Sequence, residues 1–256
     1  MCLLLISYKT NPSYKFIVAA NRDEFYNRPT EPAKYWDTKP RVLAGKDLLA
    51  GGTWMGITED GRFAGITNYR DPNHMRKDAP TRGKIVSDFL TGGKSPEQYG
   101  EQLLKDAALY NGYNLIFGGI ESLFYFSNQT GKLLKMEPGV YGLSNHLLDT
   151  PWPKVEKSKK SFKAIVENEE IVAGDLFSIL SDNSKPPDDL LPDTGMGLEI
   201  ERAVSPVFVS TPFYGTRSST VLFVDSSGNA RFVEKSLNIE TKEWITSAYD
   251  LKLRMK

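Results

Sequence analysis

The residue of this chain with the clearest chemical potential is its single cysteine, Cys2, which directly follows Met1. Methionine aminopeptidase removes an initiator methionine when the next residue is small, so we expect a mature chain that begins with the cysteine. An α-amine has a pKa near ~8 and a thiol one of about 8.5, so the terminal amine can take the thiol proton. The resulting thiolate can attack an acyl carbon. The alternative interpretation is a small apolar residue that opens a strand.

Two charged residues, Arg22 and Asp23, come soon after an apolar segment that predicts a strand over Lys15–Ala20. Another strand is predicted over Cys2–Tyr8. If the two strands pair as a hairpin, the end of the second returns beside Cys2. An arginine at that place favours the thiolate, and an aspartate there accepts a hydrogen bond from the α-ammonium group. The alternative is a solvated loop, which is the usual place for a charged block.

Three further polar residues complete the candidate catalytic set: Asn68, Asn145 and Arg217. Asn68 ends a predicted strand, and Arg217 precedes another one. The side-chain amide of asparagine is a suitable donor to an oxyanion, although an asparagine at a strand end is also an ordinary turn residue. Trp54 and Gly52 are candidates for lining a substrate pocket, or for simple packing.

The composition excludes several other kinds of site. Lys+Arg and Asp+Glu both total 32 in 256 residues, so the basic excess of a duplex DNA binder is missing and we expect no nucleic-acid partner. One cysteine and two histidines, His74 and His146, are too few for a Cys/His zinc site, and we expect neither a metal nor a cofactor. No segment is long enough to span a membrane, and the opening apolar run is too short for a signal peptide, which predicts a cytoplasmic protein. The sequence does not predict the oligomeric state.

Strands are predicted towards both ends of the chain and helices in the middle, which favours one α+β domain over residues 1–256. Residues 27–50, with three prolines, and residues 181–197 predict long loops. Helices are predicted over Thr81–Leu90, Pro96–Leu109 with Ser95 as its N-cap, Trp152–Val166 and Asp175–Leu180. Further strands are predicted over Thr53–Ile57, Arg62–Asn68, Tyr113–Ile120, Leu123–Ser127, Lys132–Met136, Val207–Ser210, Ser219–Asp225 and Ala230–Glu234.

Four ordered blocks resemble the NRDE family, which includes the transport and Golgi organisation protein 2 homologues. The resemblance runs along nearly the whole chain, and four blocks in the expected order are more specific than any one of them. The blocks are Met1-Cys2, Asn21-Arg22-Asp23-Glu24, Gly51-Gly52-Thr53-Trp54-Met55-Gly56 and Tyr214-Gly215-Thr216-Arg217-Ser218-Ser219-Thr220.

More distantly, the same blocks resemble the choloylglycine hydrolase group of N-terminal-nucleophile enzymes, which includes bile salt hydrolases and penicillin V acylases. That resemblance implies a four-layer αββα sandwich without a metal. It also implies a nucleophilic cysteine followed about twenty residues later by an arginine and an aspartate, which are adjacent here, unlike in that group. The residues that match its catalytic positions are Cys2, Arg22, Asp23, Asn68, Asn145 and Arg217.

Three functional hypotheses follow from these observations. The first is an amidohydrolase or acyl transferase that acts on a C–N amide bond of a small acyl or amide ligand, with Cys2 as nucleophile. The second is a non-enzymatic binding or trafficking protein for a lipid, acyl-CoA or haem that retains the same fold. The third gives the N-terminal cysteine a structural role alone. Because fold does not imply function, the enzyme hypothesis depends on the geometry of the site.

Overall fold

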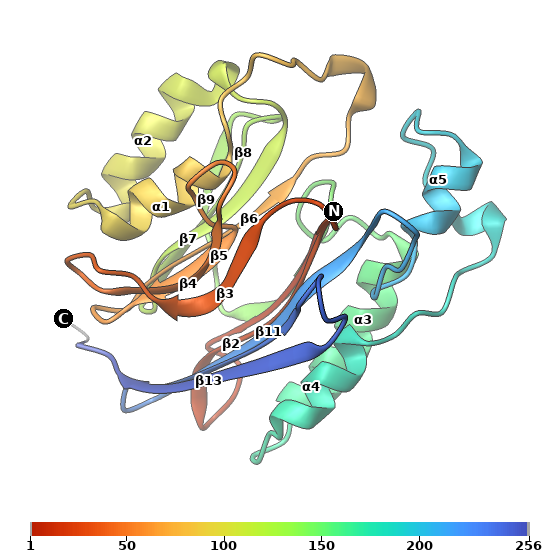
Figure 1. The fold of residues 1–256 in the computed structure, drawn as a ribbon. Coiled ribbons are helices and arrows are strands. Elements are labelled where there is room, and N and C mark those ends of the chain that lie inside the picture. The colour runs from red at the N-terminus through yellow and green to blue at the C-terminus, as the bar shows by residue number, and fades with distance from the viewer. Residues whose placement is uncertain (1, 255–256) are drawn as a thin grey trace.

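The computed structural model of the protein describes residues 2–254. Within this range the strands form two antiparallel sheets that are stacked face to face (Figure 1). The first sheet has the order β10 (Gly139–Leu143), β1 (Cys2–Tyr8), β2 (Tyr14–Phe25), β11 (Tyr214–Asp225), β12 (Asn229–Leu237) and β13 (Trp244–Lys252). The second has the order β3 (Thr30–Tyr35), β4 (Val42–Asp47), β5 (Met55–Thr58), β6 (Arg62–Asn68), β7 (Tyr113–Gly119), β8 (Ser122–Ser127) and β9 (Lys132–Lys135).

Helices cover the outer face of each sheet, so the four-layer αββα arrangement is confirmed (Figure 1). Helices α1 and α2 pack on the second sheet, and α3 and α4 pack on the first. The α-helices are α1 (Gly83–Thr91), α2 (Pro96–Asp106), α3 (Pro153–Val166), α4 (Ala173–Leu180) and the short α5 (Leu198–Ala203). Single 3₁₀ turns occur at Pro72–His74, Ala107–Leu109 and Asp188–Leu190. None of the helices in the described part of the chain is long and apolar enough to cross a membrane.

The alternation of side chains along β1 and β2 decides which residues reach which layer. Leu4 and Ile6 belong to the core between the two sheets, whereas Leu3 and Leu5 belong to the core under α3 and α4. Successive side chains of a strand point to opposite faces, so Cys2 continues the face that looks between the sheets. By the same rule, β2 directs its even-numbered residues between the sheets and its odd-numbered residues towards the helices.

The predicted loop over residues 27–50 is wrong, because β3 and β4 lie within it. Its prolines are tolerated since β3 is an edge strand, where the missing N–H of Pro32 costs no ladder bond, and the register is irregular between Glu31 and Lys34. Two hydrogen bonds tie this edge to the first sheet. The backbone N–H of Ala33 donates to the carboxylate of Glu234 on β12, and the hydroxyl of Tyr249 on β13 donates to the carbonyl of Ala33.

Other elements also differ from prediction. The block after Ala20 continues β2, because β1 and β11 pair with it on both sides. Strand β11 begins at Tyr214, so Arg217 lies inside it, at a register irregularity, and does not precede it. The segment predicted as the strand Val207–Ser210 has one isolated bridge, at Ser210. Helix α5 and the largely exposed strand β13 were not predicted, whereas Ser95 caps α2 as expected.

Candidate active site

The pairing of β1 with β2 brings the first two candidate residues together. Cys2 is the direct antiparallel partner of Arg22, so the predicted hairpin forms with the register that the site needs. Strand β11 pairs with the other edge of β2, where Ser218 lies opposite Arg22 and Thr216 opposite Asp23. The start of β1, the end of β2 and the start of β11 therefore meet at one place. The predicted removal of Met1 concerns a residue outside the described range.

Cys2 is a free, half-buried cysteine. Burial raises the pKa of its thiol, and the nearby Asp23 carboxylate raises it further. The backbone N–H of Asp23 and the charge of Arg22 act in the opposite direction but do not reverse this rise in pKa. The protonated thiol is therefore the favoured form in the free protein, and a nucleophilic role requires a base.

Arg22 is buried beneath an aromatic ring and beside two carboxylates. Its guanidinium group lies 4.2 Å from the ring centroid of Trp54. The nearest carboxylate oxygens of Glu24 and Asp47 are 3.7 and 4.0 Å away. Burial lowers the pKa of Arg22, an effect that these carboxylates oppose. Since an arginine stays charged in proteins, this group supplies permanent positive charge beside the thiol.

Asp23 projects from the opposite face of β2 and is buried. Its Oδ1 accepts a hydrogen bond of 2.7 Å from the hydroxyl of Thr216, and its carbonyl accepts one of 2.9 Å from Tyr214. Burial raises the pKa of the Asp23 carboxyl, while the bond from Thr216 and the charges of Lys154 and Arg22 lower it. The carboxylate is thus fixed in position from β11.

Asn145 is fully buried and joins the end of β6 to the segment after β10. Its side-chain amide donates a 2.8 Å hydrogen bond to the carbonyl of Asn68, and the hydroxyl of the preceding Ser144 donates one of 3.0 Å to the carbonyl of Cys2. Asn68 therefore reaches this region through its main chain, because its side chain is exposed. The oxyanion roles assigned to both asparagines stay predictions.

Arg217 holds the loop that follows β2. Its guanidinium donates to the carbonyls of Phe25, Tyr26 and Arg28 at 3.0, 3.2 and 3.0 Å. A single side chain thereby ties three carbonyls at and after the end of β2 to β11. Its position depends on main-chain acceptors, which no residue pattern in the sequence reveals.

A cavity of about 500 Å³ opens beside Arg22, Trp54 and Arg217. Neither Cys2 nor Asn145 is among the residues that line it. Gly52 is not among the residues that line it, so its expected pocket role stays a prediction. A Cβ at Gly52 would lie 2.4 Å from the carbonyl carbon of Gly83, so glycine is needed for close approach to α1. The lining residues are Arg22, Tyr26, Asn27, Arg28, Pro29, Thr30, Glu31, Pro32, Leu48, Trp54, Arg217, Ser218, Ser236, Leu237, Asn238, Ile239, Glu240 and Ile245.

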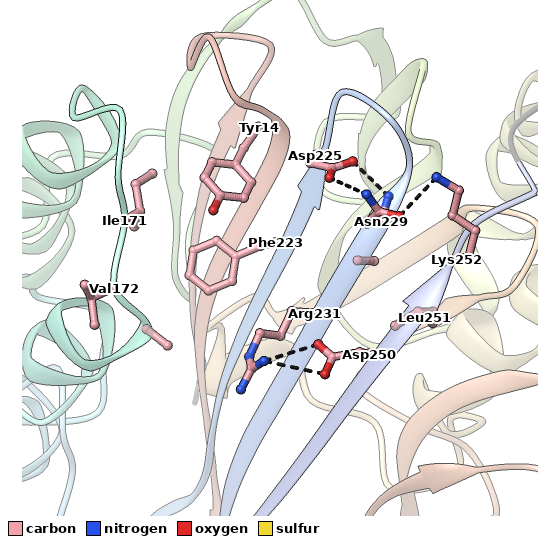
Figure 2. A pocket seen from close by; sticks show the side chains of 12 residues that line it. Tyr14, Ile171, Val172, Phe223, Asp225, Asn229, Arg231, Asp250, Leu251 and Lys252 are labelled. Atoms are coloured by element: carbon pink, nitrogen blue, oxygen red, sulfur yellow. Dashed lines mark hydrogen bonds and ion pairs between the residues drawn. The ribbon is translucent and has the colours of Figure 1, made fainter.

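A larger hollow of about 760 Å³ lies elsewhere, along β11, β12 and β13 beside the start of α4 (Figure 2). Its wall combines Phe223 and Val172 with an exposed ion pair of 3.3 Å between Arg231 and Asp250. None of the candidate catalytic residues lines it. Across residues 2–254, no group of three or more His, Cys, Asp or Glu side chains is placed to hold a metal ion.

Two basic residues near Cys2 were missed at the level of sequence. Arg82, which precedes α1, donates to the carbonyl of Gly112, and its charge interacts with that of Cys2. Lys154 is buried at the start of α3 and interacts with both Cys2 and Asp23. The sequence does contain a signal for the burial of Lys154. Ser158 and Phe162 follow it at intervals of four residues, and all three are buried on the same helix face.

Solved structures share this architecture over nearly the full chain. A conjugated bile acid hydrolase from Clostridium perfringens is similar with a TM-score of 0.53 and 11% identity, covering 100% of this chain and 99% of that one. A Caenorhabditis elegans orthologue of N-acylethanolamine-hydrolyzing acid amidase is similar with a TM-score of 0.52 and 11% identity, covering 86% and 92%. The two sheets with their outer helices, and the cysteine at the start of β1, therefore define a protein with the N-terminal-nucleophile hydrolase fold.

Sequence relatives define the family within that fold. The family described as Transport and Golgi organisation 2 matches residues 1–239. The mouse Transport and Golgi organization 2 homolog is 35% identical, over 99% of this chain and 100% of its own length. The human homologue is 33% identical over the same shares. This chain belongs to the Transport and Golgi organisation 2 family, as the NRDE resemblance predicted.

Proposed function

We propose that this protein is an N-terminal-cysteine amidohydrolase or acyl transferase that acts on a C–N amide bond. The observation that carries the proposal is the register of β1 and β2, which sets Cys2 opposite Arg22 and next to Asp23. Both similar solved structures are named for hydrolysis, which supports the same reaction class by analogy. We further propose the cytoplasm as its compartment, where a lone cysteine stays reduced.

The proposed reaction begins with loss of Met1, which frees the α-amine of Cys2. This amine accepts the thiol proton, and the sulfur forms a bond to the amide carbonyl carbon. The tetrahedral intermediate collapses as the C–N bond breaks, and the proton passes from the ammonium group to the leaving amine. Water then attacks the thioester, the C–S bond breaks, and a carboxylic acid and the free thiol are released. An amine in place of water gives acyl transfer.

The neighbouring residues have matching roles in this proposal. Asp23 accepts from the α-ammonium and orients it, and Arg22 favours the thiolate. A carboxamide nitrogen carries two hydrogens. The bond to the carbonyl of Asn68 uses one hydrogen of Asn145, and the second is the candidate donor to the oxyanion.

A second candidate is a binding or trafficking protein for a lipid, acyl-CoA or haem. The observation in its favour is that the relatives are named for transport and Golgi organisation and not for a reaction. The cavity beside Arg22, with basic, aromatic and aliphatic walls, suits an amphiphilic ligand in either case.

The deciding experiment follows hydrolysis of a panel of N-acyl amides by the wild type and by Cys2→Ala. We expect the variant to lose roughly 10³-fold or more in kcat with an unchanged melting temperature, because no other thiol exists to replace the nucleophile. Asn145→Ala should lower kcat by about 10²-fold if its amide donates to the oxyanion. Equal turnover by wild type and Cys2→Ala contradicts the proposal. Retained ligand binding without any turnover supports the carrier instead.

A further inference from the structure

Lys154 occupies an unusual place for a lysine. It is the second residue of α3, behind Trp152 and Pro153, and only 6% of its surface is exposed. The helix packs on β1 and β10, so this first turn lies close to the start of β1. The side chain therefore approaches the Cys2 site from the helix layer, whereas Arg22 approaches it from between the sheets.

The ammonium group of Lys154 is buried without a hydrogen-bond partner among the described residues. Four ionisable groups from four different segments act on it: Asp23 on β2, Cys2 on β1, Arg70 after β6 and Glu201 on α5. A buried cation with no hydrogen bond is costly to the fold. An apolar residue beside Val155 would avoid that cost.

Two of these four groups, Arg70 and Glu201, are paired with each other. Arg70 and Glu201 form a buried ion pair, and the guanidinium of Arg70 lies 4.6 Å from the ring centroid of Trp152. Glu201 also accepts a 3.1 Å hydrogen bond from the backbone of Thr194. The remaining charges near Lys154 belong to Asp23 and Cys2, which are the groups of the proposed reaction.

We propose that Lys154 is a positioning residue of the Cys2 site, whose buried ammonium favours the carboxylate of Asp23 and the thiolate of Cys2. Its positive charge also disfavours a second proton on a neighbouring α-amine, because like charges repel. The inference goes beyond the proposed function by adding a residue from the helix layer, and it rests on that function in treating Cys2 as the reactive group.

The protonation state of Lys154 depends on the charges of the neighbouring Asp23 and Cys2. Burial lowers the pKa of Lys154 to about 8, although the charges of Asp23 and Cys2 raise it. The group therefore changes charge in the pH range where a cysteine thiol also ionises. Such neighbours titrate as a coupled set, so a change at Lys154 must appear in the ionisation of Cys2.

The test measures alkylation of Cys2 by iodoacetamide as a function of pH. Cys2 is the single cysteine, so the midpoint of this profile reports its ionisation without any substrate. We expect Lys154→Met to slow alkylation roughly tenfold below pH 8, where Lys154 is charged, and so to shift the profile upward there, because a stabilising cation is lost. Lys154→Arg, which keeps the charge, should restore most of the shift.

Lys157→Met is the matched control, since Lys157 lies on the same helix but is exposed and paired with Asp182 at 2.6 Å. It should leave the midpoint unchanged. Coincident profiles for the wild type and a folded Lys154→Met overturn the inference, and so does an equal shift in Lys157→Met. If Lys154→Met does not fold, Lys154→Gln decides by the same criterion. If the protein does not hydrolyse amides, the proposed function is contradicted, but the alkylation profile still tests the role of Lys154 because it needs no substrate.

Discussion

The end of β2 presents two faces that differ in charge and in the contacts that hold them. On the face between the sheets, Arg22 and Glu24 lie near Asp47 and Trp54, and Arg22 borders the cavity. On the face towards the helices, Asn21 and Asp23 are buried under the helix layer of α3 and α4. One strand thus carries an accessible charged face and a sealed polar one.

Hydrogen bonding explains what the sealed face does. The amide of Asn21 donates to the carbonyls of Leu180 and Val207 at 2.8 and 2.9 Å, and its Oδ1 accepts from Ser219 at 2.6 Å. Asp23 is held from Thr216 in the same way. Buried polar groups of this kind fix geometry because each lost bond leaves an unsatisfied partner.

The accessible face has looser contacts. Its ion pairs are 3.7 to 4.0 Å long, and the guanidinium of Arg22 is stacked on Trp54. The Asn21-Arg22-Asp23-Glu24 block is therefore divided by face: its odd-numbered residues are held by buried hydrogen bonds, and its even-numbered residues carry the charges near the cavity.

The largest expected effect tests this division by stability. Asn21→Ala should lower the free energy of unfolding by about 3–4 kcal/mol, because three buried hydrogen bonds are lost together. Glu24→Ala on the other face should cost less than about 1 kcal/mol, as partly exposed ion pairs do. Urea denaturation of both variants provides the measurement. Equal losses would show that the two faces do not differ in this way.

The second prediction concerns Lys154, the buried lysine on the helix side of β2. The folded-state pKa of Lys154, which burial lowers to about 8, lies below its unfolded value of 10.5, so the unfolded chain binds the extra proton between these pH values. Stability from this group is therefore lowest below pH 8 and rises towards pH 10.5. Lys154→Met should stabilise the protein by about 3 kcal/mol at pH 7, and the difference should shrink over that window. Urea denaturation at pH 7 and at pH 10 measures the difference in unfolding free energy between the two proteins. A Lys154→Met variant that is less stable than the wild type at both pH values contradicts the prediction.

The smallest expected effect lies on the accessible face. Arg22→Gln should raise the midpoint of Cys2 alkylation by less than about one pH unit, because burial already raises the thiol pKa and the charge of Arg22 opposes it only in part. A downward midpoint shift would contradict the proposed role of Arg22.

Much of this arrangement could be predicted from local patterns. The apolar runs of β1 and β2 predicted the hairpin, and with it the return of Arg22 to Cys2. The Ser95 cap predicted the start of α2. The ordered family blocks predicted the four layers, which no single periodicity specifies.

The remainder depends on tertiary contacts that local patterns do not encode. The prolines near Pro32 suggested a loop, although an edge strand accepts them. Lysine is rarely buried, so its residue type alone predicts an exposed position for Lys154, which is in fact buried. The contacts of Arg217 are with main-chain carbonyls of a distant segment, so the residue types around it carried no signal.

In the proposed reaction Cys2, freed at the chain terminus, forms a covalent acyl intermediate. The most direct measurement is the intact mass of untagged protein before and after exposure to a thiol-reactive acyl probe. We expect a starting mass that lacks Met1 and a single acyl adduct that maps to Cys2 and is absent in Cys2→Ala. Complete retention of Met1, or an adduct formed equally by Cys2→Ala, would contradict it.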